Sequence, residues 1–93
     1  MNIELLHNSC KDATRKAFDE YKRQIDVVLF PFNTSLHENF KKQMFQDIGM
    51  QVYKLFINSN NLSTPKLKVL SNTISQYKAI ASKTADNYCK RFL

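Results

Sequence analysis

Apolar side chains recur at every third or fourth position over most of this chain, which is the spacing of one face of an α-helix. In the first third of the sequence the pattern predicts a helix over residues 3–29. Asn8 and Ser9 both favour turns, so a break near them stays open. The predicted inward positions are Ile3, Leu6, Cys10, Ala13, Ala17, Tyr21, Ile25 and Val28.

Charged residues fill the opposite side of this first helix. Asp12 precedes Lys16 by four positions, and Asp19 precedes Arg23 by the same spacing. An acid four residues before a base is the favourable order for an ion pair on an exposed helical face. The stretch KAFDEYKRQI therefore predicts an amphipathic helix with a solvated outer face.

The second periodic segment follows a proline. Pro31 disfavours a helical conformation at the residue before it, and this predicts the end of the first helix. Ser35 and Glu38 have the S-x-x-E spacing of a capping box, with Thr34 as an alternative cap. We therefore expect a second helix over residues 36–58. Its predicted inward positions are Leu36, Phe40, Met44, Ile48, Val52, Leu55 and Phe56.

A polar loop, NSNNLSTP, separates the second helix from the third. Thr64 is the predicted N-cap of the third helix, with Pro65 at the first helical position. The alternation that follows predicts a helix over residues 65–91. Its predicted inward positions are Leu67, Leu70, Ile74, Tyr77, Ala81, Thr84 and Tyr88.

Residues that break regular structure are scarce, since the 93 positions include one glycine and two prolines. So few breakers disfavour a many-stranded β-fold and suit a few long helices. We predict an all-α, up-down-up three-helix bundle that forms a single domain over residues 1–93. Gly49 lies inside the second helix at a cost of about 1 kcal/mol relative to alanine. It predicts the close approach of a neighbouring helix, with a hinge as the alternative.

The net charge of +6 is distributed unevenly. Up to residue 30 there are five basic and five acidic residues, and of the totals of 14 and 8 this leaves nine and three for the remainder. Such an excess permits binding to an acidic protein, an anionic membrane or nucleic acid. The third helix has one arginine among its spread lysines, so it favours phosphate contact over base recognition. The candidate contact residues are Lys66, Lys68, Lys78 and Lys83.

The aromatic residues off the predicted inward stripes are chiefly Phe32, Phe45 and Phe92. Most of the other aromatic side chains lie on those stripes, where core packing explains them. Aromatic side chains that form a contiguous exposed patch mark an interface. These three residues are therefore candidates for docking a protein partner.

Candidate catalytic groups are few. A phosphate-binding loop needs several glycines, which this chain lacks. His7 and His37 have no metal-ligand spacing to Cys10 or Cys89, so neither a metal nor another cofactor is predicted. His7 lies one turn from Cys10, which leaves a Cys–His enzyme as an alternative that requires a lowered thiol pKa. The leading prediction is a protein without enzymatic activity.

The distribution of apolar runs also predicts the cellular compartment of the protein. No apolar run reaches the roughly 20 residues of a membrane span. No basic segment followed by an apolar run indicates a signal peptide. The two cysteines are too few for a disulfide framework. We therefore expect a cytoplasmic protein with buried, reduced thiols, peripheral to a membrane if the segment belongs to a larger chain.

Three segments of the chain resemble the helical middle domain of guanylate-binding proteins and atlastins, which are dynamin-related large GTPases. The first is KAFDEYKRQI with the small residues before it, the second is the proline linker with the helix from Leu36 to Phe56, and the third is YKAIASKTADNYCKRFL. The residues in matching places are Ala13, Ala17, Tyr21, Ile25, Cys89 and Leu93.

The resemblance covers residues 8–93 and implies an architecture and a role. No GTPase domain is present to carry over catalytic residues. In the family the middle bundle packs on the GTPase domain and swings or crosses over on dimerisation, which couples hydrolysis to membrane tethering, fusion or remodelling. For this chain the resemblance implies a non-catalytic interaction module that associates with itself or with a large GTPase. The alternative, from the charge, is a small basic bundle that binds nucleic acid or an anionic membrane surface.

Overall fold

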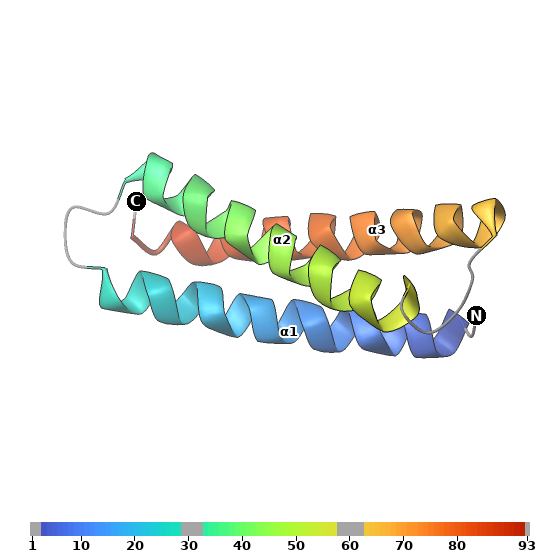
Figure 1. Ribbon diagram of the computed structural model, residues 1–93. Helices are drawn as coiled ribbons and strands as arrows, with labels where there is room; N and C mark the ends of the chain where they lie inside the picture. The colour runs from blue at the N-terminus through green and yellow to red at the C-terminus, as the bar shows by residue number, and fades with distance from the viewer. Residues whose placement is uncertain (1–2, 29–32, 58–62, 93) are drawn as a thin grey trace.

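Three long helices make up the described part of the chain, and they confirm the predicted all-α bundle. The computed structural model describes residues 3–28, 33–57 and 63–92. Its helices are α1, Ile3–Val27, α2, Thr34–Ile57, and α3, Thr64–Cys89. They run up-down-up, so the start of α1, the end of α2 and the start of α3 lie at the same end (Figure 1). The bundle is a rod of 47 × 19 × 18 Å.

The buried side of α1 follows the predicted stripe closely. Six of its eight predicted positions are buried, in an unbroken helix that has no interruption at Asn8 or Ser9. Ile3 is 57% exposed and Val28 is half-buried, because both lie at the ends of the helix where its neighbours no longer cover it. The buried residues of α1 are Leu6, Cys10, Ala13, Ala17, Tyr21 and Ile25.

In the second half of α3, the buried stripe differs from the predicted one. Thr84 was expected inside but is exposed, and Ala85 is fully buried in its place. A straight α-helix drifts by about 20° per heptad from a strict seven-residue repeat, so the buried stripe moves on by one residue. The buried residues of α3 are Leu70, Thr73, Ile74, Ala81, Ala85 and Cys89.

Two further predicted core positions, Leu55 and Leu67, are exposed at the end of α2 and the start of α3. They lie where the bundle stops and where no third helix covers them. In α2 the structure also buries Gly49 and His37, which the apolar pattern did not place inside. The buried residues of α2 are His37, Met44, Ile48, Gly49, Val52 and Phe56.

Both helix starts that follow a loop lie earlier than predicted. Asn33 caps α2, because the backbone N–H of Leu36 donates to Asn33 Oδ1 over 2.9 Å. The predicted capping box at Ser35 is therefore wrong, and Ser35 lies inside the first turn. Asparagine is at least as good an N-cap as serine or threonine, which explains the earlier start. At α3 the N-cap is Ser63 and not the predicted Thr64.

The surface ion pairs of α1 are spaced by three residues, so the predicted pairing four residues apart is wrong. Asp12 lies 4.0 Å from Arg15, and Asp19 lies 4.0 Å from Lys22. Arg23 pairs with Glu20 over 2.5 Å. Exposed pairs of this kind contribute about 0–1 kcal/mol, so they solubilise the outer face more than they stabilise the fold.

Gly49 does not face the backbone of a neighbouring helix, which corrects the prediction of close helix approach. A Cβ built at Gly49 would lie 3.1 Å from Nζ and 3.3 Å from Cε of Lys78 on α3. Lys78 is half-buried, and the end of a lysine side chain is flexible. The small residue at position 49 therefore makes room for the Lys78 side chain alone.

This contact predicts that Gly49→Ala stabilises the fold. Alanine removes the helical cost of glycine, so we expect the free energy of unfolding to rise by up to about 1 kcal/mol once Lys78 shifts. Urea denaturation measures the change. The reverse substitution at an exposed helical position, Ala79→Gly, is the control and should lower stability by a similar amount. A loss of stability in Gly49→Ala would show that Lys78 cannot move aside.

Candidate functional site

A chain of polar side chains joins all three helices near the end of the bundle where α1 finishes. The Tyr21 hydroxyl of α1 donates to the Ala85 carbonyl of α3 over 3.0 Å, and its oxygen lies 2.9 Å from His37 Nδ1 of α2. His37 Nε2 donates to Asp86 Oδ1 over 2.8 Å, and Lys41 Nζ donates to the same oxygen over 3.1 Å. Each contact crosses between helices, so the network fixes how the three are placed along one another.

The protons in this network can be counted. Tyr21 has a single hydroxyl proton for two neighbours, the Ala85 carbonyl and His37 Nδ1. The Asp86 carboxylate can only accept, so His37 Nε2 is the donor in their contact.

Tyr21, His37 and Asp86 follow one another in the order of a catalytic triad, in which a nucleophile contacts a base and the base contacts an acid that orients it. Tyr21, however, is 1% exposed, and desolvation by burial raises the pKa of its hydroxyl. A nucleophile needs a substrate to reach it and a lowered pKa. The network therefore acts as a tie between helices, and sequence reasoning missed it because it placed Tyr21 in an apolar stripe and left His37 outside the core.

The proposed Cys–His pair does not have the geometry of an activated thiol. Cys10 is completely buried, and burial raises its pKa, which is the opposite of what a nucleophilic cysteine requires. His7 Nδ1 lies 3.1 Å from the Tyr77 hydroxyl. Both cysteines are free and buried, as predicted. Among the described residues no cluster of potential metal ligands occurs.

Exposed aliphatic side chains, two from each helix, lie at one end of the bundle, and we call this group of residues the apolar end. It lies where α1 begins, α2 finishes and α3 begins (Figure 1). Its side chains are 36–57% exposed. Sequence reasoning assigned three of them to the core, although the up-down-up topology already predicted that these helix ends meet. The residues of the apolar end are Ile3, Leu5, Leu55, Ile57, Leu67 and Val69.

Two of the predicted contact lysines belong to this surface. Lys66 and Lys68 alternate with Leu67 and Val69 in the first turns of α3, and all four are exposed. Lys54 adds a third exposed cation from the last turn of α2. The apolar end therefore combines aliphatic side chains with positive charge.

The other predicted contact residues are not brought together. Phe45 and Phe92 are partly buried and pack against the core, and the Phe92 ring lies 5.8 Å from that of Tyr88. Lys78 covers Gly49, and Lys83 is exposed further along α3. Phe32 and Leu93 lie outside the described residues.

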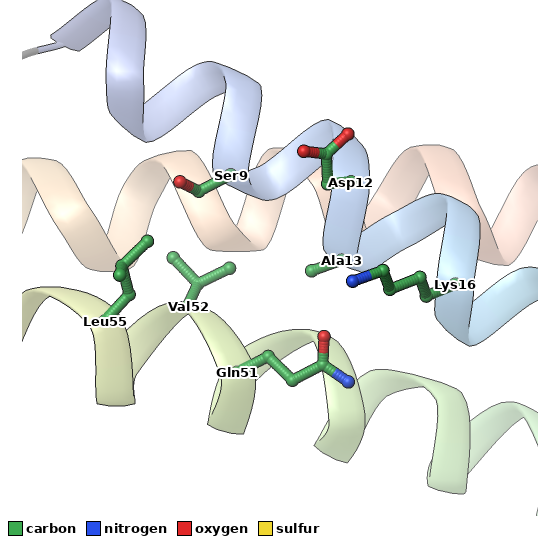
Figure 2. A pocket seen from close by; sticks show the side chains of 7 residues that line it. All are labelled: Ser9, Asp12, Ala13, Lys16, Gln51, Val52 and Leu55. Carbon is green, nitrogen blue, oxygen red and sulfur yellow. The ribbon is translucent and has the colours of Figure 1, made fainter.

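A shallow hollow of about 220 Å³ lies between α1 and α2 (Figure 2). Asp12 points away from α2, and Lys16 reaches over the opening. Asp12 lies 4.0 Å from Arg15, not from Lys16, so the hollow holds no acid–base pair. Its lining residues are Ser9, Asp12, Ala13, Lys16, Gln51, Val52 and Leu55.

No family model, curated protein or solved structure matches this chain. Within the described ranges, none of the three helices has the length and apolar character needed to cross a membrane. A functional assignment therefore depends on the apolar end, the hollow between α1 and α2 and the polar network.

The polar network predicts that Tyr21→Phe destabilises the fold. Removing the hydroxyl leaves the buried His37 Nδ1 without its partner inside the bundle, so the free energy of unfolding should fall by about 1–3 kcal/mol. The control is Tyr88→Phe, whose hydroxyl donates over 2.7 Å to the exposed Asp26. It should cost less than about 1 kcal/mol, because water replaces this exposed bond. Equal losses in urea denaturation would contradict the role of the network.

Asp86 predicts a stability change in acid. The hydrogen bond from His37 lowers the pKa of Asp86 below its ordinary value of 3.8. A lowered folded-state pKa stabilises the fold fully above the unfolded-state pKa, and this stabilisation disappears as the pH falls through the folded-state value. Unfolding free energies measured between about pH 2 and pH 6 should therefore decline below about pH 4 more steeply for the wild type than for Asp86→Asn. Asp47→Asn, outside the network, should keep the wild-type slope; an unchanged slope in Asp86→Asn would contradict the prediction.

Proposed function

We propose that the chain is a non-catalytic helical interaction module that acts in the cytoplasm through helix-mediated association, with itself or with a large GTPase. The observation that carries this proposal is the apolar end. It presents six large aliphatic side chains, drawn from all three helices, to solvent. Scattered exposed aliphatic residues are ordinary on a protein surface, but several gathered at one place mark an interaction site.

The position of the apolar end suits association between helices. A partner that covers it would extend the core beyond Leu6 and Leu70, the fully buried residues nearest to this end. Covering it removes apolar surface from water at about 25 cal/mol per Å². Contact with a GTPase is the mode that the resemblance to guanylate-binding proteins and atlastins implies.

The lysines of the apolar end favour a second candidate function, the binding of an anionic membrane surface or of nucleic acid. Exposed cations beside aliphatic side chains can contact phosphate groups while the aliphatic side chains remain at the interface. Salt separates the two candidates. Binding to phosphate-bearing surfaces weakens steeply with salt. Self-association through this end brings lysines of two copies together, so salt should strengthen it by screening their repulsion.

The proposed association predicts a concentration-dependent sedimentation coefficient. Leu67→Gln combined with Val69→Gln should shift the chain to a monomer, because both side chains lie in the apolar end and neither supports the core. Val27→Gln is the matched control, since Val27 is 69% exposed at the opposite end of the bundle. The same variants should lose co-sedimentation with a purified atlastin-type GTPase domain. A compact monomer at every concentration, with no affinity for that domain, would overturn the proposal.

A further inference from the structure

The hydroxyl of Tyr21 lies between two groups that can each accept its single hydrogen. Its oxygen is 3.0 Å from the Ala85 carbonyl oxygen and 2.9 Å from His37 Nδ1. Both contacts are buried, with Tyr21 1% and His37 5% exposed. Because a hydroxyl hydrogen turns about the C–O bond, Tyr21 can donate to either neighbour without moving its ring.

The far side of the His37 ring fixes which nitrogen is protonated when the ring is neutral. Nε2 lies 2.8 Å from Asp86 Oδ1, and a carboxylate can only accept. Nε2 therefore carries a hydrogen in the neutral ring and in the charged ring alike. In the neutral ring Nδ1 is then an acceptor, and the Tyr21 hydroxyl donates to it.

A second proton on His37 reverses this contact and does not break it. Nδ1–H now donates to the Tyr21 oxygen, and the hydroxyl hydrogen turns to the Ala85 carbonyl. That carbonyl has two lone pairs, so it can accept the hydroxyl in addition to a backbone N–H. The proton comes from solvent, and the Asp86 carboxylate, whose side chain is 49% exposed, balances the new charge.

We propose that the Tyr21 hydroxyl is a rotor that lets the buried His37 take up and release a proton while the three helices stay tied together. The hydrogen bond between Tyr21 and His37 changes its direction, and the distance between the two side chains stays the same. The inference is independent of the apolar end and of the partner proposed there, because the rotor shares no residue with it.

Three neighbours of His37 hold their charge between about pH 5 and about pH 8. Burial raises the pKa of the Tyr21 hydroxyl, and the hydrogen bond from His37 lowers the pKa of Asp86. Partial burial lowers the pKa of Lys41, but its hydrogen bonds to Asp86 and Glu38 outweigh this effect and raise it. All three shifts lead away from the range in which an ordinary histidine titrates. The other ionisable groups beside this network are Glu38, Tyr88 and Cys89.

The first test is NMR of the His37 ring in the wild-type chain. Long-range spectra that join ring protons to ring nitrogens should show a neutral ring protonated on Nε2 at about pH 8 and a ring protonated on both nitrogens at about pH 5. Contacts between the rings of Tyr21 and His37 should persist at both values. A neutral ring protonated on Nδ1, a ring still neutral at about pH 5, or loss of the ring contacts there would overturn the rotor.

The second test compares Tyr21→Phe with the wild type. Without the hydroxyl, the charged ring has a buried N–H with no acceptor, and bonds to charged groups contribute more than neutral ones. The pH midpoint of the His37 ring signals should therefore fall by about one unit, which is tenfold weaker proton binding. Since the unfolded chain still takes up this proton near pH 6.5, stability is lost as the pH falls, and the deficit of the variant in urea midpoint should widen from about pH 8 to about pH 5.

The chain offers a matched control in a second tyrosine–histidine contact. His7 Nδ1 lies 3.1 Å from the Tyr77 hydroxyl, and His7 is half-buried, so water can replace the hydroxyl in Tyr77→Phe. The deficit of this control in urea midpoint should be the same at both pH values. A deficit of Tyr21→Phe that is likewise independent of pH would show a tie without a rotor and would overturn the proposal.

Discussion

Each helix of this bundle can bury only one stripe of side chains, because only two neighbours cover it. The rod is 19 × 18 Å across, which is the width of a single layer of core residues between three helices. Small residues such as Ala17 and Ala81 keep the helices close where larger side chains would separate them. Everything outside the three stripes lies at the surface. This constraint produces both the solvated outer faces and the two apolar surfaces that no helix covers.

A core this thin leaves little apolar contact to define how far one helix slides along another. The Tyr21–His37–Asp86 chain supplies that definition, because its hydrogen bonds form only at one relative placement of the three helices. Lys41 completes it by donating to the same carboxylate. Buried polar networks of this kind specify one arrangement when every member is satisfied. Two further contacts cross between helices closer to the apolar end, from His7 to Tyr77 over 3.1 Å and from Tyr53 to Ser71 over 2.6 Å.

The exposed apolar side chains of the bundle lie in two kinds of place. Those of the apolar end come from all three helices, and the exposed Lys66 and Lys68 alternate with two of them. A second hollow, between α1 and α3, is short, because a polar contact lies beside each of its ends.

The sequence alone determined the number, length and order of the helices, because apolar spacing and scarce breakers are local signals. It also determined most of the α1 stripe, from Leu6 to Ile25. Tertiary structure alone decided the rest. Whether Leu55 and Leu67 are buried depends on where the neighbouring helices stop, which no local pattern records. The burial of His37 depends on Tyr21 and Asp86, 16 and 49 residues away, whose hydrogen bonds compensate for its desolvation.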